Sequence, residues 1–137
     1  MRKVETHELA YHTVSRDASL IVKVTRNTER YTDVEAIVSD LLRCERLIMD
    51  VHRPSHGLIF DTRQAPSVRD SEEYERKVVP VQMRISGGWA GTAVIVRSSV
   101  GKLQVQRLSR GVPAAFTTVT SEDEARAWLK TRLETTK

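Results

Sequence analysis

The chain has only one cysteine, Cys44, so it cannot form an internal disulfide bond. A chain without disulfides is typical of a reducing compartment. Aromatic residues make up only 5% of the sequence, and no apolar run approaches the roughly 18 residues that span a membrane. The N-terminal residues also lack the apolar core of a signal peptide. Together these absences predict a cytoplasmic protein with no membrane span.

The sequence also lacks long blocks of like charge. Its 22 basic and 18 acidic residues are interspersed and leave a formal net charge of +4. A surface that stacks single-stranded nucleic acid needs aromatic residues among the basic ones, and that pattern is missing here. The basic balance therefore does not predict nucleic acid as the partner.

What the sequence does contain is an ordinary globular composition. Hydrophobic residues make up 39% and charged residues 29% of the 137-residue chain, a length that suits one core. No linker, internal repeat or low-complexity segment divides it. We therefore expect a single domain over residues 1–137, with its core at about residues 8–130.

Apolar patterns predict an α/β domain with about five strands and four helices in the order ββαβαβαβα. Strands are expected at residues 9–14, 20–25, 57–61, 91–96 and 115–119. A short turn separates the first two strands, which favours antiparallel pairing. The later strands alternate with helices, and this order requires right-handed crossovers between parallel strands. The expected sheet is therefore mostly parallel or mixed.

Helix boundaries are predicted from capping residues. The expected caps are Thr32 (in a capping box with Glu35), Asp70, Ser98 or Ser99, and Ser121 (in a capping box with Glu124). The first helix should run to about Val51 and stop before Pro54. Pro80 lies inside the second helix and is expected to break or kink it, because proline lacks the N–H group and its ring clashes with the preceding turn.

Five segments of this layout carry a resemblance to a known group: Leu58-Ile59-Phe60-Asp61-Thr62-Arg63, Ala93-Val94-Ile95-Val96-Arg97, Val105-Gln106-Arg107, Phe116-Thr117-Thr118 and Glu124-Ala125-Arg126-Ala127-Trp128-Leu129. They resemble the STAS-like group, which has the fold of bacterial anti-sigma factor antagonists and related SpoIIAA-like proteins. The resemblance implies a bacterial regulatory domain with the STAS-like fold.

Phosphorylated members of that group carry an Asp-Ser-Ser-Gly-like turn after the third strand, where a partner kinase modifies a Ser or Thr. Residues 61–71 form the corresponding stretch here, and they lack this motif. The hydroxyl groups nearest to that place belong to Thr62, Ser67 and Ser71. These three residues are the candidates for phosphorylation or for contact between the loop and a partner.

Charged residues follow two neighbouring strands at the edge where open α/β sheets bind ligands. Arg63 follows the strand at 57–61, and Arg97, Ser98 and Ser99 follow the strand at 91–96, with Lys102 nearby. A helix N-terminus and arginine side chains attract phosphates and carboxylates. The sequence therefore predicts a candidate anion or partner site. The alternative is structural: an ion pair between Asp61 and Arg97 with an ordinary serine cap.

The other reactive side chains lack the partners that catalysis or metal binding requires. His52 and His56 are four residues apart, but Pro54 lies between them, and no acidic or cysteine ligand has a matching spacing. Cys44 lies on the apolar side of the first helix, which favours a buried structural thiol. We expect no metal, no cofactor and no enzymatic activity.

The function hypotheses follow from this reading. The first is a non-enzymatic regulatory or scaffolding domain that binds a protein partner or self-associates. The alternative is a binder of a small anionic ligand, carrying phosphate or carboxylate, at the carboxyl ends of the central strands. Trp128 is expected in the core, whereas an exposed Trp89 would indicate an interface.

Overall fold

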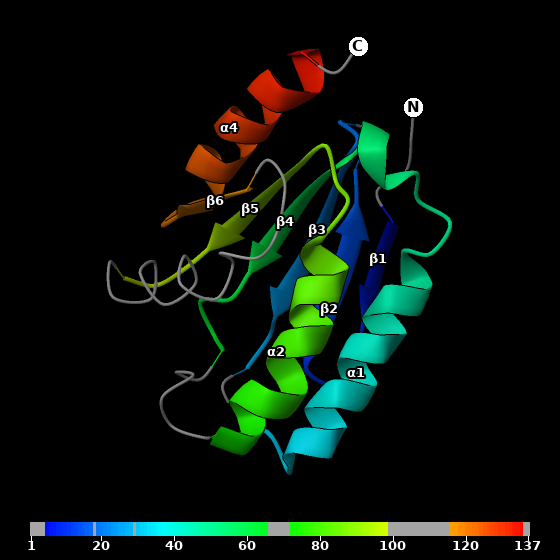
Figure 1. The fold of residues 1–137 in the computed structure, drawn as a ribbon, viewed down its shortest axis with the longest axis vertical. Helices are drawn as coiled ribbons and strands as arrows, with labels where there is room; N and C mark the ends of the chain where they lie inside the picture. Colours follow the sequence, from blue (N-terminus) through cyan, green and yellow to red (C-terminus); the bar gives the residue numbers. More distant parts are fainter. Residues whose placement is uncertain (1–4, 18, 29, 66–71, 99–115, 136–137) are drawn as a thin grey trace.

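In the computed structural model, six strands form one sheet that carries helices on both faces (Figure 1). The structure describes residues 5–17, 19–28, 30–65, 72–98 and 116–135. The strands are β1 (Glu5–Glu8), β2 (His12–Arg16), β3 (Ile21–Arg26), β4 (Gly57–Asp61), β5 (Gly91–Ile95) and β6 (Phe116–Val119). The helices in these ranges are α1 (Val34–Leu47), α2 (Glu72–Ser86) and α4 (Glu122–Thr135), with a 3-10 turn, η1 (Arg53–Ser55).

The strands lie in the sheet in the same order as in the sequence. The first three pair antiparallel, and β3 to β6 pair parallel. This confirms the α/β class and the mixed sheet. In the register, Gly57 lies opposite Gly91, and Asp61 lies opposite Ile95. As a result, β4 and β5 end side by side at one edge of the sheet.

The expected count of five strands was wrong, because two strands replace the single strand predicted at 9–14. All four side chains of β1 are exposed, so no apolar alternation marks this strand in the sequence. It forms through backbone pairing with β2. Three α-helices fall within the described ranges, and the expected third helix, at 98–111, lies almost entirely outside them.

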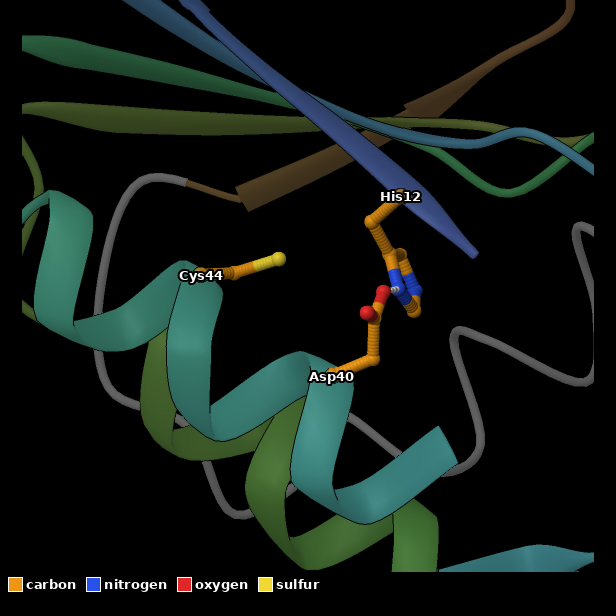
Figure 2. A group of neighbouring side chains, drawn as sticks. All are labelled: His12, Asp40 and Cys44. Atoms are coloured by element: carbon orange, nitrogen blue, oxygen red, sulfur yellow. Dashed lines mark hydrogen bonds and ion pairs between the residues drawn. The ribbon is translucent and has the colours of Figure 1, made fainter. Parts of the chain in front are cut away.

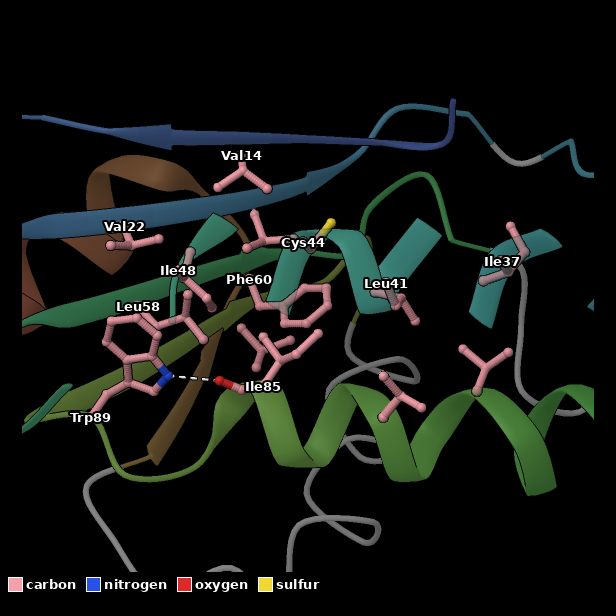
Figure 3. Packing of buried hydrophobic residues seen from close by; sticks show 14 of the residues in the cluster. Val14, Val22, Ile37, Leu41, Cys44, Ile48, Leu58, Phe60, Ile85 and Trp89 are labelled. Atoms are coloured by element: carbon pink, nitrogen blue, oxygen red, sulfur yellow. Dashed lines mark hydrogen bonds between the residues drawn. The ribbon is translucent and has the colours of Figure 1, made fainter. Parts of the chain in front are cut away.

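The main core lies between the sheet and helices α1 and α2, which run side by side over one face (Figure 1). Figure 3 shows side chains from β2, β3, β4 and both helices meeting there. Helix α1 begins after Asp33, whose carboxylate accepts a hydrogen bond from the Ala36 N–H at 2.7 Å. The expected cap at Thr32 was therefore wrong: the Thr32 hydroxyl is hydrogen-bonded to that of Tyr11 instead. The helix also ends at Leu47, earlier than expected.

Helix α2 is continuous through Pro80, so the predicted break was wrong. Pro80 and Arg76, which lies four residues before it, are both exposed. Proline has no N–H group to donate to the Arg76 carbonyl. Because this part of the helix is exposed, water can donate to that carbonyl instead. Helix α2 ends at Ser86, as the Gly87-Gly88 pair predicts, and Gly88 adopts a φ of 86° that suits glycine.

Helix α4 packs on the opposite face, against β4, β5 and β6. Ser121 caps it, since its hydroxyl oxygen accepts a hydrogen bond from the Glu124 N–H at 3.2 Å. Gly57 and Gly91 start their strands beneath this helix. A Cβ atom at Gly91 would lie 3.0 Å from the Trp128 ring, and one at Gly57 would lie 3.0 Å from a Leu129 methyl group. The two glycines therefore allow α4 to approach the sheet closely.

Both tryptophans pack against the protein. Trp89 is buried in the main core, where its indole N–H donates to the Ile85 carbonyl at 2.7 Å (Figure 3). This excludes the exposed Trp89 that would have indicated an interface. Trp128 was expected in the core, but it is only half-buried and packs against the cluster under α4 from outside. No helix within the described ranges combines the length and the hydrophobicity that a membrane span requires.

Candidate functional site

The edge where β4 and β5 end brings together several residues that the sequence singled out. We call the set Asp61, Thr62, Arg63, Ala65, Arg97 and Ser98 the carboxyl edge. Both arginines lie there because their strands are parallel neighbours in register. Four further candidates lie outside the described residues: Ser67, Ser71, Ser99 and Lys102.

Arg63 is committed to a carboxylate at this edge. Its guanidinium donates to both oxygens of Asp61, at 3.0 and 2.7 Å. The expected Asp61–Arg97 ion pair is therefore absent, because a side chain two residues away in the same chain occupies the Asp61 carboxylate. The hydrogen bonds that Arg63 donates to Asp61 raise the pKa of Arg63, and the Glu122 carboxylate at the start of α4 adds to this effect.

Arg97 differs from Arg63 in having no carboxylate partner among the described residues. Its exposed guanidinium donates one hydrogen bond to the Ala65 carbonyl at 3.2 Å. That contact ties the end of β5 to the loop that follows β4. The hydrogen bond to Ala65 therefore holds the Arg97 side chain in place, while its exposed guanidinium can still pair with an anionic group.

Thr62 stabilises the edge through its own hydrogen bonds. Its hydroxyl donates to the Ile95 carbonyl at 2.8 Å, and its N–H donates to the same oxygen at 2.9 Å. A phosphate on this hydroxyl would remove the donated hydrogen bond and add charge beside the end of β5. The geometry therefore gives Thr62 a structural role in joining β4 to β5.

A small apolar crevice opens next to Thr62, between α2 and the sheet. Its volume is about 50 Å³. Its lining includes Phe60, Thr62, Val79, Met83, Val94 and Phe116. Pockets for drug-sized ligands occupy roughly 300–1,000 Å³, so this crevice is too small to enclose such a molecule.

A second group of polar side chains lies inside the main core and was not predicted from the sequence. His12 of β2 and Asp40 of α1 form a 2.7 Å pair between Nδ1 and Oδ2, with Cys44 one helical turn further along α1 (Figure 2). Arg26 lies opposite His12 on β3. All four side chains are buried. The available signal was a charged residue, Asp40, on the apolar stripe of its helix.

Hydrogen bonds and burial set the protonation states in this group. Burial alone would raise the pKa of Asp40, but hydrogen bonds from His12, Tyr11 and Ala10 outweigh it, so the pKa of Asp40 is lowered. Burial lowers the pKa of His12 despite the neighbouring carboxylate. Burial, aided by the Asp40 charge, raises the pKa of Cys44 to about 12. At neutral pH the group therefore holds a carboxylate, a neutral imidazole and a thiol.

The donor atoms of His12, Asp40 and Cys44 all lie within 4.8 Å of one another. Such a set resembles a zinc site in its atom types. However, the Asp40 oxygens already accept hydrogen bonds from three donors. The Arg26 charge beside His12 also repels a cation. These contacts favour a hydrogen-bonded core cluster over a metal site.

His52 and His56 come together in the loop around η1. Their Nδ1 atoms lie 3.0 and 3.1 Å from the Ser55 hydroxyl oxygen. The 3-10 turn that begins at Arg53 brings them together, although they share no helix face. The contacts close a turn, and among the described residues no third ligand joins these histidines to form a metal site.

Comparison with a solved structure places this architecture. The chain is similar to an uncharacterized protein of the DUF3478 family from Shewanella loihica PV-4, described as having a SpoIIAA-like fold. The TM-score is 0.53 and the identity is 13%, over 93% of this chain and 92% of that protein. This chain has a SpoIIAA-like fold. No protein-family model matches the sequence, and no curated protein matches it. The SpoIIAA-like fold confirms the STAS-like architecture that the sequence segments indicated.

Proposed function

We propose that this chain is a non-enzymatic regulatory domain that binds an acidic surface of a partner protein at the carboxyl edge. The observation that carries the proposal is Arg97, whose exposed guanidinium is held at the end of β5 without a carboxylate partner among the described residues. Charged groups at the rim of an interface steer association and select partners of opposite charge.

The surroundings of Arg97 favour a protein over a small molecule. Arg63 is already paired with Asp61, so the two arginines do not form a clamp for one free anion. The neighbouring crevice of about 50 Å³ is too small to enclose a ligand. An exposed edge where Arg97 is the one cation without a carboxylate partner, among the residues described, suits contact with another surface. A small anionic ligand is the second candidate, supported by the position at the carboxyl ends of parallel strands.

The absence of enzymatic activity is part of the proposal. The buried thiol of Cys44 has a pKa of about 12, so it is not a nucleophile at neutral pH. The imidazole of His12 is fully buried, where no substrate reaches it. These two side chains therefore support a role in the core rather than in catalysis.

The test compares capture of proteins from a lysate of the source organism by three forms of the full chain. These are the wild type, Arg97→Glu and the control Arg43→Glu, which reverses another exposed arginine, on α1. We expect one partner to be retained by the wild type and the control, and to be reduced at least tenfold by Arg97→Glu. Purified partner and chain should then bind with a stoichiometry and salt dependence typical of an ionic contact.

Two results would overturn the proposal: equal retention of every captured protein by Arg97→Glu, or no specific protein at all. Titration with inorganic phosphate, followed by the amide resonances of Ala65 and Arg97, tests the second candidate separately. Light scattering on the same three forms tests whether a second copy is the partner, since Arg97→Glu would then lower the mass in solution.

A further inference from the structure

Asp40 fastens the hairpin of β1 and β2 to helix α1. Its carboxylate accepts hydrogen bonds from the N–H groups of Ala10 (3.2 Å) and Tyr11 (3.1 Å) and from His12 Nδ1 (2.7 Å). These donors belong to three consecutive residues at the turn between β1 and β2. We call His12, Asp40 and the two amides the hairpin clasp. Every side chain of β1 is exposed, so β1 contributes no buried side chain to the core. The hydrogen bonds of the clasp attach the hairpin to helix α1 instead.

Charged and titratable groups face His12 from helix α1 and from strand β3. Asp40 and Cys44 face it from α1, and Arg26 faces it from β3. The Arg26 guanidinium donates to the Tyr74 hydroxyl of α2 at 2.9 Å, and the rings of Tyr11 and Tyr31 each lie 5.8 Å from it. The site therefore already contains one buried positive charge.

Two buried atoms in this site have no hydrogen-bond partner among the described residues: His12 Nε2 and Arg26 Nη2. With Nδ1–H donated to Asp40, the Nε2 atom is an unprotonated acceptor. A proton on Nε2 would be a buried donor without an acceptor, next to the Arg26 charge. Such a group costs free energy that a solvated imidazole does not.

We propose that the hairpin clasp is a pH-sensitive lock, closed while His12 is neutral and opened by proton uptake on its imidazole. The opening is local: the turn at 9–12 leaves Asp40, while the rest of the sheet stays folded. This inference concerns the hairpin and is independent of the partner proposed for the carboxyl edge.

The direction of the pH response follows from proton linkage. The closed state lowers the pKa of His12 below its ordinary value of 6.5, so the open state binds more protons below pH 6.5. Opening is then favoured as the pH falls, by up to about tenfold per pH unit, until the pKa of the closed state is reached. The pKa of Asp40 is lowered from 3.8, so this carboxylate stays charged between pH 7 and pH 5.

Amide hydrogen exchange of the full chain measures the opening directly. The reporters are the N–H groups of Ala10 and Tyr11, which donate to Asp40. The reference amides are those of Thr62 and Val96, which are hydrogen-bonded just after β4 and β5 end. After correction for intrinsic exchange rates, we expect protection of the reporters to fall at least fivefold from pH 7 to pH 5. Protection of the reference amides should stay constant.

A pair of variants assigns the effect to His12. His12→Gln removes the titrating group, so its reporter protection should not change between pH 7 and pH 5. His7→Gln removes an exposed histidine on β1 and should keep the response of the wild type. A response that persists in His12→Gln would overturn the proposal, and so would reporters in the wild type that do not change with pH. A parallel loss at the reference amides would also overturn it, since that indicates global unfolding.

A measurement on the wild type keeps the test valid if His12→Gln does not fold. The ring resonances of His12 are followed by NMR from pH 8 to pH 4. We expect a midpoint below 6.5, with the Ala10 and Tyr11 amide resonances changing over the same pH range. A His12 midpoint at or above 6.5 would contradict the lock, because proton uptake would then stabilise the closed clasp.

Discussion

The cluster under α4 consists of apolar side chains, whereas the face under α1 and α2 also buries His12, Arg26 and Asp40. On the α4 face, stability comes from close packing over Gly57 and Gly91. On the other face, apolar packing surrounds polar groups that must find partners. Truncation of an apolar side chain on the α4 face removes packing contacts. Truncation of a buried polar side chain under α1 and α2 leaves hydrogen-bond donors unsatisfied. The two faces should therefore respond differently to substitution and to pH.

The largest effect is expected on the polar side, from Asp40→Ala. This variant leaves the His12 ring and two turn amides without their acceptor, and each buried donor left unsatisfied costs about 1–3 kcal/mol. The free energy of unfolding from urea titration measures the change. Asp50→Ala is the control, since Asp50 is an exposed partner of Arg16 and its loss should change stability little. Equal effects of the two variants would contradict the role given to Asp40.

The matching change on the α4 face is Leu129→Ala. Leu129 is fully buried beneath its helix, and removal of such a side chain costs about 3 kcal/mol. The same urea titrations measure it, with exposed Lys130→Ala as the neutral neighbour. The loss caused by Leu129→Ala should be the same at pH 7 and pH 5, because apolar side chains carry no titrating group. A pH-dependent loss would show that the two faces are coupled.

A smaller effect is expected when an atom is added beneath α4. The Cβ of Gly91→Ala would lie 3.0 Å from the Trp128 ring and 3.1 Å from Leu129, so the helix must shift at a cost of about 1–3 kcal/mol. Gly87→Ala is the control, because its Cβ would meet the Met83 carbonyl at an ordinary 3.6 Å. Thermal denaturation of both variants should show the larger loss at Gly91. The reverse order would mean that α4 is not closely packed on this strand.

The smallest effects are expected at the two helix caps, one on each face. Asp33→Ala removes the acceptor of the Ala36 N–H on α1, and Ser121→Ala removes that of the Glu124 N–H on α4. Each loss should cost about 1 kcal/mol. A Thr32→Ala variant distinguishes the observed cap from the expected one: it should leave the α1 amides protected from exchange, whereas Asp33→Ala should expose the first turn.

Patterns that depend on burial predicted the fold well. The strand at Gly57–Asp61 has the expected bounds, because a fully buried strand is a continuous apolar run. β1 was missed because its exposed side chains carry no such pattern. The start of α1 was placed one residue early, since both Thr32 and Asp33 can cap a helix. The choice depends on Tyr11, a residue distant in sequence that contacts Thr32.

The candidate sites were predicted less completely, because pairing is decided in three dimensions. Topology placed Arg63 and Arg97 at one edge, as expected. Which arginine pairs with Asp61 depends on the path of the loop after β4, and sequence spacing does not give that path. The clasp was missed because His12 and Asp40 are 28 residues apart. The one available signal was the position of Asp40 on the apolar stripe of its helix, since a buried carboxylate needs a partner.

The exposed strand β1 also affects how copies of this chain meet. It is the last strand of the sheet on its side, and such open edges can join into larger sheets. If two copies paired antiparallel about the midpoint of β1, Glu5 of each would face Glu8 of the other. Like charges directly opposite destabilise strand pairing. The two glutamates therefore discourage the sheet from growing from one molecule into the next.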